Sequence, residues 1–151
     1  MKKVLSILGG IFLVLILIVA VFIGIYHGNG LDASSKAYVE ANVKPIVTTW
    51  SLDELAKRSS PKLVDILKKN PGQAEQYFAK LSKLGTLKTL GEPKGQAHVA
   101  VNTGTGKVIS ATYRETAEFQ NGKADLIINL IQEDGQWRLL GFSVNSPILP
   151  Q

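Results

Sequence analysis

The chain contains an uninterrupted stretch of 23 residues, 4–26, without a charged side chain. A helix rises about 1.5 Å per residue, so about 20 residues cross the roughly 30 Å hydrocarbon core of a bilayer. Because lipid offers backbone amides no hydrogen-bond partner, such a stretch must be helical inside a membrane. We therefore expect a transmembrane helix over residues 4–26 that contacts the lipid bilayer directly.

The charges beside this stretch predict its orientation. Lys2 and Lys3 precede it, whereas residues 27–35 contain only one charged side chain, that of Asp32. Basic residues beside a span tend to stay in the cytoplasm. We expect a single-pass protein of the inner membrane with the following parts: a cytoplasmic N-terminus at residues 1–3, a linker at 27–31, a periplasmic domain at 32–146 and a tail at 147–151.

A cleaved signal peptide is the alternative to a permanent anchor. The apolar core of a signal peptide usually has about 7–15 residues, which is shorter than this stretch. No small-x-small cleavage motif follows cleanly, because the segment after residue 23 reads Gly-Ile-Tyr-His-Gly-Asn-Gly. Both observations favour a signal-anchor that is retained.

Composition excludes several classes of function. The chain has no cysteine, which rules out disulfides, thiolate metal ligands and cysteine nucleophiles. Its two histidines, His27 and His98, form no ligand cluster, so we expect no metal site and no cofactor. Without Lys2 and Lys3 the 17 basic residues become 15 against 12 acidic ones. This mild excess is not typical of nucleic-acid binding.

Helix signals fill the first half of the expected domain. Ser51 and Glu54 form a capping box, and Ser60-Pro61 places a cap before a proline at the first helical position, so helices should end near residues 58 and 69. A further helix is expected over residues 73–84. For the first helix, Asp32, Ser34 or Ser35 is the expected cap, and Pro45 predicts a kink or a break.

Strand signals fill the second half. Residues 87–90 and 97–102 have the pattern of one strand interrupted by Gly91-Glu92-Pro93, and three strands follow at 108–120, 123–133 and 136–145. Asn121-Gly122 and Asp134-Gly135 predict two-residue type I′ hairpin turns. Helices followed by such strands predict an α+β domain with helices packed on a curved antiparallel sheet of about four strands.

Two-residue turns fix the register of a hairpin, and this register predicts a candidate pocket. It places Glu115 opposite Ile128 on an apolar face, with Gly141 next in the row and Tyr113 on the same face. A carboxyl group in apolar surroundings has a raised pKa, which suits a general base or a hydrogen bond to a ligand. The alternative is that Glu115 pairs with a lysine at the rim of the sheet or turns outward at a bulge.

The same register leaves apolar side chains on the opposite face of the last two strands, where clean alternation is expected for a two-layer domain. A homodimer through this face would bury them. The alternatives are that the tail folds back over the sheet or that a strand bulge changes the register. The candidate dimer residues are Ile127, Ile131, Leu140 and Phe142.

Five short motifs occupy the turns, caps and core positions of this layout: Trp50, Arg58-Ser59-Ser60-Pro61, Lys83-Leu84-Gly85, Phe119-Gln120-Asn121-Gly122, and residues 135–142, Gly-Gln-Trp-Arg-Leu-Leu-Gly-Phe. With them, residues 31–146 resemble the cystatin-like and nuclear-transport-factor-2-like α+β roll. More narrowly, the chain is similar to small uncharacterised bacterial membrane proteins with an N-terminal anchor and one such domain. The resemblance implies the roll fold, whose members include enzymes, ligand pockets and assembly scaffolds.

The sequence carries no catalytic signature. We therefore expect a membrane-anchored, non-enzymatic interaction or scaffold domain, whose partner is a second copy of the chain or another protein of a membrane complex. The alternative is a pocket for a small apolar ligand, with weak acid–base activity through Glu115 and Tyr113.

Overall fold

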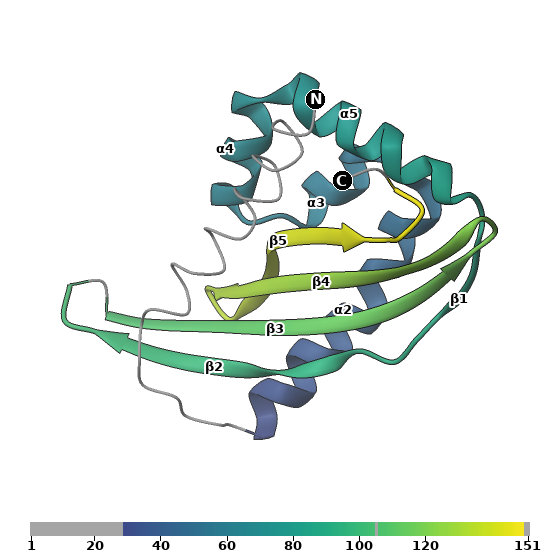
Figure 1. Ribbon diagram of the computed structural model, residues 1–151. Coiled ribbons are helices and arrows are strands. Elements are labelled where there is room, and N and C mark those ends of the chain that lie inside the picture. Colours follow the sequence, from purple (N-terminus) through teal and green to yellow (C-terminus); the bar gives the residue numbers. More distant parts are fainter. Residues whose placement is uncertain (1–28, 105, 150–151) are drawn as a thin grey trace.

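The computed structural model describes residues 29–104 and 106–149. The expected cytoplasmic N-terminus and transmembrane helix, residues 1–26, lie outside the described residues. Within the described ranges, no helix is both long enough and apolar enough to span a membrane. These residues form an α+β domain in which four α-helices pack on a five-stranded antiparallel sheet (Figure 1).

The helices occupy the first half of the described chain, and the two that follow Ser51 and Ser60 begin where these capping residues predict. The hydroxyl oxygen of Ser51 accepts the amide of Glu54 at 3.4 Å, and that of Ser60 accepts the amide of Leu63 at 3.3 Å. Pro71 lies inside the last α-helix, at its first turn, where a missing amide costs nothing. The elements are α2 (Asn29–Thr49), α3 (Leu52–Arg58), α4 (Pro61–Lys69), α5 (Pro71–Leu81) and the 3₁₀ turn η1 (Ser82–Leu84).

Helix α2 differs from its prediction in two respects. Ser34 and Ser35 lie inside the helix and are not caps, because their hydroxyls donate to the carbonyl of Leu31 one turn back. Pro45 does not end the helix. Fully buried apolar side chains lie before and after Pro45 in the sequence, and they hold both halves of the helix against the core. These side chains are Val39, Val43, Ile46 and Val47.

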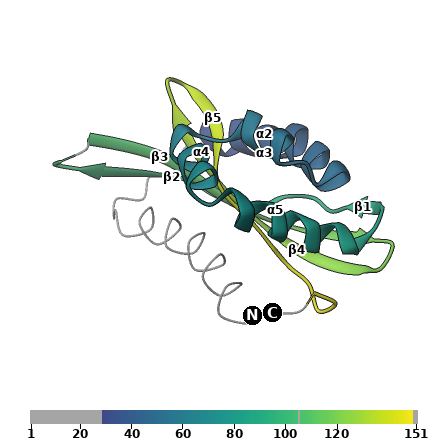
Figure 2. The same ribbon diagram turned by 90° about the horizontal axis from the view of Figure 1, so that it is seen from above.

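Five strands form the second half: β1 (Leu87–Leu90), β2 (Lys94–Asn102), β3 (Gly106–Phe119), β4 (Gly122–Glu133) and β5 (Gln136–Asn145). The sheet order is β1-β3-β4-β5, and β2 also pairs with β3. Strands β1 and β2 therefore follow each other along the same edge of β3, which confirms the predicted interrupted strand. In both views the β2–β3 hairpin extends beyond the helices (Figures 1 and 2), and Val101 on it is 66% exposed.

The two hairpin turns have different outcomes. Asp134 and Gly135 both have positive φ, 52° and 75°, which confirms the type I′ turn between β4 and β5. The β3–β4 turn consists of Gln120 and Asn121, and Phe119 pairs with Gly122. The predicted pairing there was wrong by two residues. The amide of Asn121 donates to the carbonyl of Leu84, and its side chain donates to Lys83, so contacts with η1 select this turn.

A bulge in β5 changes which residues share a face. The pairing shifts between Asn129 and Leu130, so that Ile128 pairs with Phe142 and Asn129 pairs with Gly141. Phe142 therefore lies on the helix-covered face, inside the core and 1% exposed. Its predicted place on the candidate dimer face is corrected by this bulge.

The other candidate dimer residues have different surroundings. Ile127 and Ile131 are half-buried on the face of the sheet away from the core, and Leu140, the extra residue of the bulge, is buried. The chain after β5 folds back, because the Ser146 hydroxyl donates to the Lys123 carbonyl at 2.6 Å and Leu149 packs against the core. The predicted bulge is thus present, the chain after β5 turns back toward the core, and the homodimer stays a prediction.

Candidate functional site

The inward face of β3 carries two polar residues in succession, and α2 encloses the first of them. The Tyr113 hydroxyl lies 2.8 Å from the Ser35 hydroxyl and donates to the carbonyl of Asp32 at 3.0 Å. The Asp32 carboxylate accepts the amide of Ala97 in β2 at 2.7 Å. The start of α2 is therefore tied to both β2 and β3, and Tyr113 has its hydrogen bonds satisfied.

Glu115 is the second polar residue on this face, and its surroundings are different. It lies opposite Leu126 in β4 and is 2% exposed. Its Oε1 atom is buried and has no hydrogen-bond partner. Among the described residues, Trp50 Nε1 is the one other buried side-chain atom in this condition. A buried polar atom without a partner costs about 1–3 kcal/mol, so such atoms are rare in native folds.

The edge of the sheet is interrupted beside Glu115. Leu90 pairs with Ala117 and Lys94 pairs with Arg114, so the residues between them leave Glu115 without a pairing partner on that side. The amide of Gly91 donates to the carbonyl of Thr116 at 2.8 Å. A Cβ at Gly91 would lie only 2.8 Å from that carbonyl oxygen, so the sequence needs glycine where the chain leaves the ladder.

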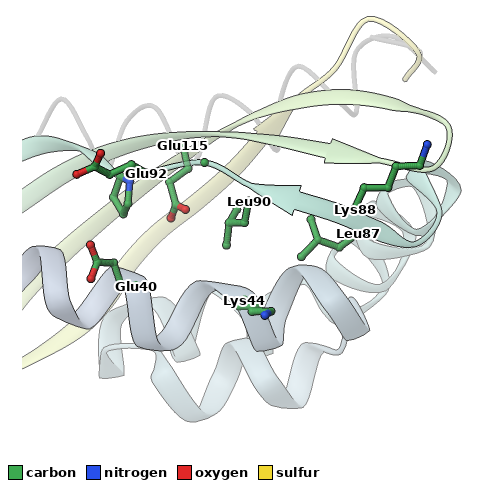
Figure 3. A pocket seen from close by; sticks show the side chains of 9 residues that line it. Glu40, Lys44, Leu87, Lys88, Leu90, Glu92 and Glu115 are labelled. Atoms are coloured by element: carbon green, nitrogen blue, oxygen red, sulfur yellow. The ribbon is translucent and has the colours of Figure 1, made fainter.

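A cleft of about 580 Å³ opens at this interruption. Figure 3 shows the Glu115 carboxyl group pointing from β3 toward α2, between Glu40 and Leu90. This volume is within the usual range for small-molecule sites. We call it the α2 cleft, lined by Glu40 and Lys44 from α2, by Leu87, Lys88, Leu90, Gly91, Glu92 and Pro93 from the edge, and by Glu115.

Burial, and to a smaller extent the nearby Glu40 carboxylate, together raise the pKa of Glu115 to about 7. At neutral pH the group is therefore divided between its neutral and charged forms. Glu92 at the rim is in the opposite situation. Its hydrogen bond and ion pair with Lys36 lower the pKa of Glu92. That pair also links α2 to the interrupted edge.

The three residues of the predicted pocket do not lie together in the structure. Glu115 and Tyr113 share the inward face, as expected, but the Tyr113 hydroxyl is used by α2 and does not line the cleft. Gly141 lies on the opposite face, since it pairs with Asn129, whose side chain accepts a hydrogen bond from Thr112. The row beside Glu115 is Leu126 and then Val144. The shifted turn and the bulge together explain why Gly141 was misplaced.

The α2 wall of the cleft was not predicted from the sequence. Lys36, Glu40 and Lys44 recur every four residues, which places them along one side of a helix. This spacing beside a buried apolar stripe could have indicated a polar helix face. Three further α-helices separate α2 from the interrupted edge in the sequence, so no short turn fixes their relative position. The sequence therefore did not show which strand the polar face of α2 packs against.

No group of three or more residues able to hold a metal ion occurs in the described ranges. Comparison of the chain with protein-family models, with curated proteins and with solved structures finds no match. The geometry of the α2 cleft is therefore the basis for a functional assignment.

Proposed function

We propose that this domain binds a small amphipathic ligand in the α2 cleft, with Glu115 as the buried polar anchor. The observation that supports the proposal is the Oε1 atom of Glu115, which is buried without a hydrogen-bond partner at the inner end of a cleft. A ligand group that donates a hydrogen bond there would remove the cost of the unpaired oxygen. The apolar side chains of Leu87 and Leu90 would contact the rest of the ligand.

The proposal is binding and not turnover. The acid–base pair expected from the sequence is not assembled in the cleft, because the Tyr113 hydroxyl is hydrogen-bonded to α2 and does not line it. This favours a ligand-binding module over the acid–base enzyme. The unpaired carboxyl oxygen of Glu115 also ranks ligand binding above the scaffold function expected from the sequence, because it offers an acceptor for a ligand.

We also propose that the binding module is held at the outer face of the inner membrane. The support is the uncharged stretch at residues 4–26 and the two lysines that precede it. Such an arrangement would present the α2 cleft to small molecules of the periplasm.

A fragment screen by ligand-observed NMR on the full-length chain in a mild detergent tests the binding function. We expect hits that bind the wild type and Glu118→Gln but bind Glu115→Gln at least tenfold more weakly. Glu118 is a matched control, because it lies on the same strand, faces the other way and pairs with Lys123 at the surface. Hits that bind Glu115→Gln as well as the wild type, or no hits at all, would contradict the proposal.

A further inference from the structure

We propose that the ligand is an organic cation, an aliphatic ammonium ion, whose nitrogen lies between the carboxyl groups of Glu115 and Glu40. This inference rests on the proposed function and names the ligand class of the same cleft. Leu87, Leu90 and Pro93 would contact the carbon chain of the ligand. Figure 3 shows Glu40 on α2 and Glu115 on β3 toward the same end of the cleft, on its two facing walls.

Two unfavourable electrostatic features occur together at Glu115 in the α2 cleft. Glu115 has a buried oxygen without a partner, and the carboxylate of Glu40 repels its charge. A neutral donor would satisfy the oxygen and leave the repulsion in place. An anionic ligand would add a third negative group. A cation with several N–H donors relieves both features at once.

An ammonium ion fits this cleft better than a metal ion does. A metal ion needs several converging ligands at short distances, and no such group of residues occurs in the described part of the chain. An ammonium ion needs only two or three acceptors. Its carbon chain also gains from apolar contact, which the edge residues of the cleft supply.

The remaining charged groups around Glu115 leave this position available. From α2, Lys44 also lines the cleft, and Lys36 is engaged with Glu92 at the rim. From the interrupted edge, Lys88 lines the end of the cleft away from Glu40 (Figure 3). The inward-facing residues of β4 beside Glu115 are apolar. Glu40 is thus the carboxylate that acts with Glu115.

Ammonium binding should be linked to protons. A bound cation favours the charged carboxylate, so binding lowers the pKa of Glu115 from about 7. At pH 7 the free protein carries about half a proton on this group, and that fraction is released on binding. Affinity should therefore be highest above pH 7 and fall up to about tenfold for each pH unit below it, as long as the amine remains protonated.

The test uses three probes with the same four-carbon chain, n-butylammonium, n-butanol and butyrate, titrated into the full-length chain in a mild detergent. Binding is followed by the side-chain carboxyl ¹³C resonances of glutamate. We expect n-butylammonium to bind at least tenfold more tightly than n-butanol and butyrate, and to shift the Glu115 resonance. Glu115→Gln should lose at least tenfold in affinity, Glu40→Gln about threefold, and Glu118→Gln nothing.

The outcomes separate the ligand class from the proposed function. If n-butylammonium does not bind, or if its affinity does not depend on pH between 5 and 8, the cation assignment is overturned. Butanol binding that equals butylammonium and disappears in Glu115→Gln would likewise overturn the cation assignment, while it would support the cleft as a ligand site.

Discussion

Tyr113 and Glu115 are two residues apart on the same face of one strand and equally buried, yet the hydrogen bonds of Tyr113 are completed by α2 while Glu115 lines a cleft. Both face α2, and both carry an oxygen that needs a partner. The Tyr113 hydroxyl contacts the Ser35 hydroxyl and the Asp32 carbonyl, while Glu115 Oε1 has no partner. The difference arises from the neighbouring edge, which is a continuous strand at Tyr113 and an interruption at Glu115.

This contrast teaches that the backbone of the edge decides which inward polar group can serve a ligand. Opposite Tyr113, Gly95 lets β2 approach β3 so closely that a Cβ there would lie 1.9 Å from the carbonyl oxygen of Thr112. Opposite Glu115, residues 91–93 leave the ladder. Helix α2 completes the hydrogen bonds of Tyr113, whereas beside Glu115 it forms only one wall of the α2 cleft.

The largest expected effect is that of Gly95→Ala. The added Cβ would collide with backbone atoms that cannot move without breaking the β2–β3 ladder, so we expect a loss of at least about 3 kcal/mol in the free energy of unfolding. Urea unfolding followed by circular dichroism measures it. Gly72→Ala is the control, because a Cβ there meets nothing within 4 Å. Equal stability of the two variants would show that the close approach is not needed.

Glu115→Gln should change the pH dependence of stability. The pKa of Glu115 rises from 4.5 to about 7 on folding, so the native state holds this proton more strongly than the unfolded state. Stability is then highest below pH 4.5, falls by about 3 kcal/mol between pH 4.5 and 7, and stays low above pH 7. Glutamine removes this fall, so at pH 9 the variant should be more stable by up to about 3 kcal/mol.

Denaturant titrations of the wild type and Glu115→Gln at pH 5, 7 and 9 measure this effect. Glu118→Gln is the control and should leave the curve unchanged in shape. If the difference in unfolding free energy between the wild type and Glu115→Gln instead shifted in favour of the wild type from pH 5 to pH 9, the pH dependence would have the opposite sign. That result would contradict the burial argument.

Tyr113→Phe should cost about 1–2 kcal/mol, because it removes one hydroxyl from a buried network and leaves the Ser35 hydroxyl with its bonds to its own helix. Tyr38→Phe is the matched control, since the Tyr38 hydroxyl makes one bond, to the Arg58 carbonyl, in a half-buried position. Thermal unfolding of both variants checks the order. Ligand binding in the cleft should survive Tyr113→Phe, and its loss would mean that the two regions are not separate.

The smallest effect is expected for Glu92→Gln. It breaks the ion pair with Lys36 at the rim, which is exposed to solvent on both sides. Exposed ion pairs contribute little to stability, so we expect no measurable change in melting temperature. Faster hydrogen exchange at the amide of Gly91 would show that the pair instead orders the interruption. Lys57→Gln, at another exposed ion pair, is the control.

Local patterns predicted most of the elements. Ser51 and Ser60 act as caps because the hydroxyl and the amide it binds are only three residues apart, and Asp134-Gly135 forms its turn because both residues take positive φ. The inward face that contains Tyr113 and Glu115 also survives, since a register shift of two residues preserves the faces of a strand.

The failures occurred where distant contacts decide local structure. The β3–β4 turn is set by Asn121 bonding to residues of η1, which a local turn pattern cannot include. The bulge at Leu140 carries Phe142 into the core, and alternation of apolar residues gave no sign of it because both faces of β5 are apolar. The sequence therefore predicted that the pKa of Glu115 is raised. It predicted neither the contribution of Glu40 to this shift nor the α2 cleft that both residues line.

The most direct test of this account is the titration of the Glu115 carboxyl group itself. Glutamate carboxyl ¹³C shifts of the full-length chain, assigned with Glu115→Gln, can be followed from pH 4 to pH 9. The account predicts a midpoint at about 7, with a lower midpoint in Glu40→Gln. A midpoint near 4.5, unchanged in Glu40→Gln, would mean that Glu115 is solvated or paired, and would contradict the unpartnered anchor on which both proposals depend.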